Sequence, residues 1–184
     1  MPTPLSNAEE YALALDGLSW RQGSLISPHP APPLLKQRAQ LVYERIPDWA
    51  VAAGHTAGWV WSGMGRAEPW SLLAPIVPAI SPMARQTWKP RSQAGFENGL
   101  TSVANLRLLS LEATQTDLLT CEGVDEQIAC QLFCLMRPET IRAIVDRARQ
   151  RPGYTATKRE RLRRRVTLTR LWWDAHPDVT RYTS

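Results

Sequence analysis

The spacing of apolar residues becomes regular in the last 75 residues of the chain. After Ser110, apolar positions recur at helical spacing in runs that proline or glycine separates, a pattern typical of consecutive amphipathic helices. Ser110 is a suitable N-cap, because a serine oxygen accepts hydrogen bonds from the free amides of a first helical turn. The pattern predicts four helices, at residues 111–122, 125–136, 138–149 and about 155–174.

The first half of the chain is less regular. Apolar residues at helical spacing predict a helix over residues 34–46, which ends before Pro47. A short apolar run at 50–53 follows, and we expect a compact helix around 56–62, closed by Gly63.

The compact helix carries both small and large side chains. Ala57 and Gly58 permit close packing of a neighbouring element. Trp59 and Trp61 are two positions apart and therefore point to different faces of the helix. We expect this helix to lie between two packed layers.

Five prolines interrupt residues 68–99. Proline fits neither a helix interior nor the middle of a sheet, so this region predicts short edge strands that turns connect. The expected strands are Ser71–Leu73, Arg85–Lys89 and Leu106–Leu111.

The chain is expected to consist of an N-terminal segment and a single domain. Residues 1–33 contain a short helix that ends at Gly17, and a loop rich in proline and small polar residues over 18–33. Residues 34–184 are expected to form one domain with a basic C-terminal helix. The predicted fold class is α+β, with a small irregular antiparallel sheet packed with mostly C-terminal helices.

Positive charge is concentrated near the C-terminal end. The formal net charge is +5, but residues 142–170 hold eleven Lys or Arg and only two acidic residues. The rest of the chain holds eleven basic and fifteen acidic residues, and is therefore acidic. The excess of positive charge is therefore local to this segment.

The basic residues fall mainly on the last predicted helix, which is amphipathic. Its apolar stripe consists of Leu162, Val166, Thr169 and Trp173, widened by Leu168, Leu171 and Trp172. The candidate nucleic-acid-binding residues on the remaining surface are Lys158, Arg159, Arg161, Arg163, Arg164 and Arg165.

Three interpretations of this basic helix are open. The arginines are the solvated face of a helix that docks on the domain, or they contact nucleic acid and release counterions from its phosphates. The third interpretation, binding to an anionic membrane surface, is weakened because Trp172 and Trp173 are clustered at one end of the helix. Nothing in the pattern predicts base specificity.

The sequence favours a soluble cytoplasmic protein with no membrane partner. It has no run of eighteen apolar residues, and its first residues lack the basic region of a signal peptide. Its three cysteines cannot form a closed disulfide framework, so Cys121, Cys130 and Cys134 are expected to be reduced and buried. No phosphate-binding glycine motif and no metal-ligand spacing occurs, so neither a cofactor nor a metal is expected.

Isolated polar residues offer weaker signals. His55 lacks an identifiable nucleophile and orienting acid, so capping or a core hydrogen bond is favoured over catalysis. Asp117 is favoured as an early-helix carboxylate bonded to backbone amides over an acid in a cleft. An enzymatic interpretation would need a carboxylate cluster, for which Glu112, Asp117 and Glu122 are the obvious candidates.

The order of short motifs over about residues 34–166 resembles the regulator family around AbiEi, the antitoxin of type IV abortive-infection systems. In that family a helix leads to a histidine-threonine-alanine segment, as at His55, Thr56 and Ala57. A strand then enters a helix with threonine and aspartate, as at Thr114, Asp117 and Leu118, and a proline-glycine turn, as at Pro152 and Gly153, precedes a basic helix.

The resemblance implies a toxin-antitoxin function. The chain also departs from the pattern of the family in several places, and these departures limit what the resemblance implies. Members often begin with a winged helix-turn-helix that binds their own promoter, and some continue into a restriction-endonuclease-like domain. We expect neither a complete winged helix before Leu34 nor a nuclease-like domain, and position 113 is Ala where the family commonly has arginine.

The expected function is therefore that of a non-enzymatic AbiEi-like antitoxin or transcriptional regulator. Its basic helix would contact DNA, another nucleic acid or an acidic protein. The alternative is a protein-interaction domain that uses exposed tryptophans or the first helix and has no nucleic-acid role. The sequence indicates no particular oligomeric state.

Overall fold

A computed structural model describes residues 12, 15–16, 19–27, 31–75, 80–151 and 153–176 of the 184-residue chain. The strands are β1 (Trp20–Gln22), β2 (Leu25–Ser27), β3 (Val51–Ala52), β4 (Leu72–Ala74), β5 (Arg91–Ser92), β6 (Leu100–Val103) and β7 (Leu106–Leu109). The helices are α2 (Leu35–Tyr43), α3 (Gly54–Ser62), α4 (Pro82–Trp88), α5 (Leu111–Leu118), α6 (Asp125–Leu135), the 3-10 turn η1 (Pro138–Thr140), α7 (Ile141–Gln150) and α8 (Ala156–Ala175). The predicted α+β class is confirmed, with most of the helical residues in the C-terminal half.

The main sheet has five strands in the order β5-β4-β3-β7-β6. It is mixed where the sequence predicted an antiparallel sheet. The β3–β4 and β6–β7 pairs are antiparallel, whereas β3–β7 and β4–β5 are parallel. The parallel β4–β5 pair follows from α4, because a helical crossover allows consecutive strands to run in one direction.

Residues 82–88 form α4, so the strand predicted at Arg85–Lys89 is wrong. The Ser81 Oγ accepts a hydrogen bond from the Ala84 backbone amide over 3.2 Å and caps the helix. Pro82 then occupies the first turn, where a missing amide hydrogen removes no intrahelical bond. The proline that suggested an interruption therefore marks the start of a helix.

The segment predicted as a loop over 18–33 contains the β1–β2 hairpin. Leu25 is 1% exposed within the core, and Trp20 stacks on Trp59 with 6.1 Å between ring centroids. These contacts join the hairpin to the body of the protein. The helix predicted before Gly17 lies largely outside the described residues.

Helix α3 lies between the sheet and α6, as predicted for the compact helix. All its residues from 54 to 60 are buried. Trp59 contacts the hairpin, while the Trp61 indole donates a hydrogen bond to the Leu109 carbonyl of β7 over 3.0 Å. Gly58 faces α6 so closely that a Cβ there would lie 2.4 Å from the Gln131 Oε1.

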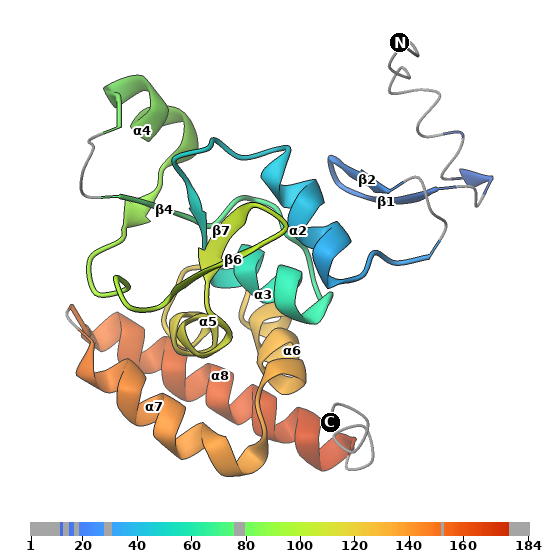
Figure 1. Cartoon of the computed structure of the whole chain (residues 1–184). Helices are drawn as coiled ribbons and strands as arrows, with labels where there is room; N and C mark the ends of the chain where they lie inside the picture. Colours follow the sequence, from blue (N-terminus) through green and yellow to red (C-terminus); the bar gives the residue numbers. More distant parts are fainter. Residues whose placement is uncertain are drawn as a thin grey trace.

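The predicted C-terminal helices are confirmed, with ends that shift by a few residues. Ser110 caps α5, since its Oγ accepts a hydrogen bond from the Ala113 amide over 3.3 Å. Helix α5 lies beside the sheet, and α7 and α8 form the outermost layer on that side (Figure 1). A second apolar cluster fills the space among α5, α6, α7 and α8, including Leu118, Leu132, Ile144 and Leu162.

Candidate nucleic-acid interface

Helix α8 begins and docks as its sequence predicts. The Thr155 Oγ1 accepts a hydrogen bond from the Lys158 amide over 3.3 Å and caps the helix. Leu162, Thr169 and Trp173 are buried along the predicted stripe. The predicted widening of that stripe is wrong for Leu171 and Trp172, which are 58% and 37% exposed.

Arg165 is buried, and its prediction as a nucleic-acid contact is wrong. Its side chain has no exposed surface, and its Nε donates to the Asp125 Oδ1 over 2.8 Å. One terminal nitrogen donates to the Leu118 carbonyl over 2.6 Å, and the other to the Gly123 carbonyl over 3.4 Å. A charged side chain tolerates such burial only because it is paired and hydrogen-bonded.

Two further arginines on this side of α8 are paired with acids. Arg164 lies 3.2 Å from a carboxylate oxygen of Asp125 and 3.6 Å from one of Glu126. Arg161 lies 3.6 Å from Glu122. These acids precede or open α6, so the pairs join α8 to the N-terminal end of its neighbour and leave less free positive charge on this flank.

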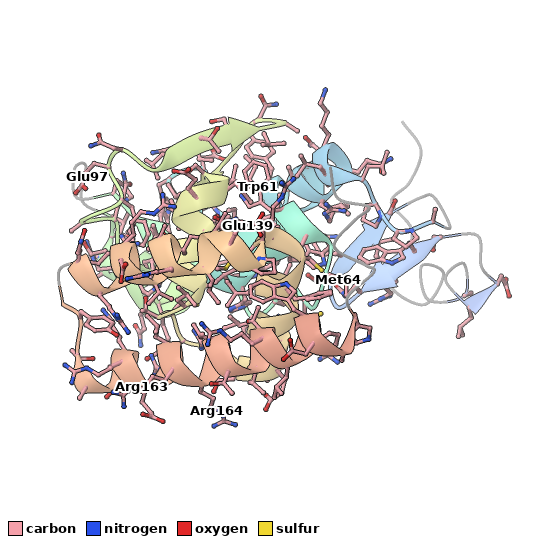
Figure 2. The ribbon with its side chains drawn as sticks, turned by 90° about the horizontal axis from the view of Figure 1, so that it is seen from below. Trp61, Met64, Glu97, Glu139, Arg163 and Arg164 are labelled. Carbon is pink, nitrogen blue, oxygen red and sulfur yellow. The ribbon has the colours of Figure 1, made fainter. Side chains whose placement is uncertain are left out.

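The opposite flank of α8 has unpaired arginines. Arg159, Arg163 and Arg170 are exposed, and none has an acidic partner among the described residues. Because they are four and seven positions apart, they lie on one side of the helix. Figure 2 shows Arg163 at the outer surface of α8 and α7 running beside that helix. On α7, Arg142 is also exposed and has no acidic partner in the described part of the chain.

We call the set Arg159, Arg163 and Arg170 the arginine surface. Two of its members, Arg159 and Arg163, belong to the predicted set. Arg170 is not among the predicted contacts, although its charge and its position on the exposed face of the last predicted helix are evident from the sequence. What the sequence could not show is that the acids of α6 neutralise the other flank.

Lys158 belongs to neither flank of α8 and lies on the inner side of the helix. Its Nζ donates a hydrogen bond to the Gly153 carbonyl over 2.8 Å, which closes the turn between α7 and α8. The side chain also borders a cavity with Arg91, Arg151 and Arg161. Lys158 therefore belongs to a site that differs from the arginine surface.

Asp117 is buried, and only one of its partners is a backbone amide of the kind predicted. Its carboxylate accepts two hydrogen bonds from Arg91, at 2.8 and 2.6 Å, and one from the Gly54 amide at 2.9 Å. It lies in the last turn of α5, so the dipole of an early helical turn does not explain it. Burial favours the protonated acid, but the Arg91 charge and these bonds outweigh it and lower the pKa of Asp117.

His55 makes the core hydrogen bond that the sequence favoured. Its Nε2 donates to the Pro69 carbonyl, and burial lowers the pKa of the ring below its usual value. The neutral ring is therefore the form that the fold selects.

The three carboxylates proposed for an enzymatic cluster have separate basic partners. Asp117 pairs with Arg91, Glu112 with Arg147 and Glu122 with Arg161. In the described ranges, no three His, Cys, Asp or Glu side chains form a group that could hold a metal ion.

The cysteines are free thiols. Cys121 is buried as predicted, whereas Cys130 and Cys134 are only half-buried. Burial raises the pKa of the Cys121 and Cys134 thiols to about 11, and the neighbouring Cys130 adds to the shift at Cys134. At neutral pH both thiols are protonated and weakly nucleophilic.

Comparisons with known proteins found no matching family model, no similar curated protein and no similar solved structure. Among the described residues, no helix combines the length and the apolar character that a membrane crossing requires.

Proposed function

We propose that this chain is a non-enzymatic regulator of the AbiEi-like antitoxin kind, which contacts nucleic acid through its arginine surface. The observation that carries the proposal is the division of charge on α8. One flank is neutralised by Glu122, Asp125 and Glu126, whereas the other presents exposed arginines without acidic partners in the described chain.

The geometry suits the backbone of a nucleic acid. Arg159 and Arg163 are one helical turn apart, and Arg170 lies two turns further along the same side. A row of guanidinium groups on a rigid helix donates hydrogen bonds to successive phosphate oxygens. Such contacts fix position without reading sequence, so they support affinity for phosphates and say nothing of base preference.

The antitoxin part of the proposal rests on the resemblance in motif order. Its motif residues Thr114 and Asp117 lie in α5, and His55 lies in α3. All three are buried in the domain and do not belong to the arginine surface. The basic helix is the part of the resemblance that meets solvent. A nucleic-acid role is therefore tested by substitutions in the arginine surface.

The test compares two triple variants that remove the same charge. R159Q/R163Q/R170Q changes the arginine surface, and R45Q/R85Q/R107Q changes three exposed arginines on other elements. We expect fluorescence anisotropy with a labelled duplex to show binding weakened at least about tenfold in the first variant. Equal weakening in both variants would show that binding depends only on the net charge of the protein, and it would contradict the proposal.

A second candidate, an interaction with another protein chain, is favoured by one apolar site near the end of α8. Leu171 is 58% and Trp172 37% exposed, and Trp172 packs against Phe133 with 5.8 Å between ring centroids. Exposed aromatic side chains of this kind are typical anchors of protein interfaces. Sedimentation of the wild type and of W172A tests this candidate, because a dimer that dissociates in the variant would support it.

A further inference from the structure

A cavity of about 370 Å³ lies between the sheet and the turn that connects α7 to α8. Its walls come from β5 and the following loop, from the end of α5, and from the α7–α8 turn. This volume lies in the range of small-molecule sites. Its lining includes Arg91, Phe96, Asp117, Arg151, Tyr154 and Lys158.

The cavity is positively charged. Four cationic side chains border it, from Arg91, Arg151, Lys158 and Arg161, against the two carboxylates of Asp117 and Glu122. Asp117 is 2% exposed and is paired with Arg91, and Glu122 is 86% exposed and is paired with Arg161, which leaves Arg151 and Lys158 without an acidic partner among the described residues. An excess of two positive charges therefore faces the interior.

The cations are held in place before any ligand binds. Arg91 is fixed by its two bonds to Asp117 and remains 36% exposed. The Arg151 guanidinium lies 3.2 Å from the centroid of the Phe96 ring and donates to the Gly95 carbonyl over 2.7 Å. Preorganised donors of this kind lose little entropy when they bind an anion.

Tyr154 provides an independent sign of a missing partner. Tyr154 lines the cavity, and its buried hydroxyl oxygen has no hydrogen-bond partner among the described residues. A buried hydroxyl without a partner is unfavourable. An acceptor oxygen in the cavity would satisfy it.

We infer that this cavity binds a phosphomonoester dianion, either of a free mononucleotide or at the 5′ end of a nucleic-acid strand. Two negative charges balance the excess charge of the cavity. The three terminal oxygens accept hydrogen bonds from several directions, as Arg91, Arg151, Lys158 and Tyr154 present them. A single carboxylate has half the charge and one fewer oxygen. The site goes beyond the proposed function, because internal phosphates of a duplex are diesters and lie against the arginine surface.

The experiment is isothermal titration calorimetry of the full chain with AMP, adenosine, and a short single strand with or without a 5′ phosphate. We expect AMP to bind and adenosine not to bind. R151Q and Y154F should each weaken AMP binding, by about tenfold for the lost charged donor and about threefold for the lost hydroxyl. R107Q removes an exposed arginine of β7 outside both sites and should leave AMP affinity unchanged.

The two sources of the phosphate give different results. Binding of AMP assigns the site to a free nucleotide, while binding of the phosphorylated strand without binding of AMP assigns it to a strand end. Both support a phosphomonoester site. Failure of both ligands, or an R107Q effect as large as that of R151Q, would overturn the inference. Y154F removes only the hydroxyl oxygen of Tyr154 and is therefore expected to leave the fold intact. It keeps the test valid if R151Q does not fold.

Discussion

The Nε of Arg165 donates a hydrogen bond to Oδ1 of Asp125 over 2.8 Å, at a place where the arginine has no exposed surface. The same guanidinium donates to the carbonyls of Leu118 and Gly123. It therefore joins three segments: α8, the start of α6 and the connection that follows α5. The most basic stretch of the chain contains the charge that fixes the last helix to the domain.

Replacing Arg165 should destabilise the protein strongly. R165Q leaves the Asp125 carboxylate with only the exposed Arg164 as its partner, and it removes a donor from the buried Leu118 carbonyl and from the part-buried Gly123 carbonyl. We expect the free energy of unfolding to fall by about 3 kcal/mol, as for other buried pairs that lose one member. Urea denaturation measures the change. The matched control is R164Q, which breaks only exposed pairs and should change stability by less than about 1 kcal/mol.

The Asp117–Arg91 pair should make stability sensitive to acid. The folded pKa of Asp117 is lowered, so its stabilising charge is fully present above the unfolded pKa of about 4 and is lost as pH falls toward the folded pKa. D117N should therefore be less stable than the wild type at pH 7. The difference should shrink below pH 4. A difference that stays constant from pH 7 to pH 3 would show that the ionised carboxylate is not the stabilising form.

His55 should give a second pH dependence, at a higher pH. Because burial lowers its folded pKa, the unfolded chain takes up a proton first as pH falls below about 6.5. Stability should thus be greatest above pH 6.5 and decline as pH falls toward the folded pKa. H55Q should flatten this part of the curve, measured as urea midpoints between pH 5 and 8. An unchanged slope in H55Q would assign the dependence to another group.

Gly58 should resist replacement by alanine. In an isolated helix G58A would be favourable by about 1 kcal/mol. Here the added Cβ would lie 2.4 Å from the Gln131 Oε1 and 3.2 Å from a methyl group of Leu118, so the buried Gln131 amide, which donates hydrogen bonds to the His55 and Met64 carbonyls, must shift. We expect a net loss of about 2 kcal/mol, in the usual range for overpacked cores. Thermal unfolding measures the sign, and a stabilised variant would contradict the close packing.

The helical half of this fold was predictable, because the residues that begin and end its helices act locally. Ser110 and Thr155 cap helices through their own side chains, and apolar spacing alone identifies the buried stripe of α8. The mixed sheet was not predictable, because strand pairing depends on residues far apart in sequence. The β3–β7 pair joins Ala52 to Leu108, for example.

The site was predicted only in part, for the same physical reason. A helical wheel sorts side chains by direction but does not show what they meet. It placed Arg165 with its charged neighbours, although Asp125 lies forty positions away and binds it in the interior. The cavity beside Tyr154 had no sequence signal, since its cations come from β5, the α7–α8 turn and α8.

The most direct test of the arginine surface is the salt dependence of duplex binding, measured by anisotropy between 50 and 200 mM salt. Each phosphate contact contributes about 0.9 to the slope of log affinity against log salt concentration. We predict that R159Q/R163Q/R170Q reduces the magnitude of this slope by about 3, while R45Q/R85Q/R107Q leaves it unchanged. A wild-type chain that binds no duplex at 50 mM salt, or a slope that both variants reduce equally, would contradict the account.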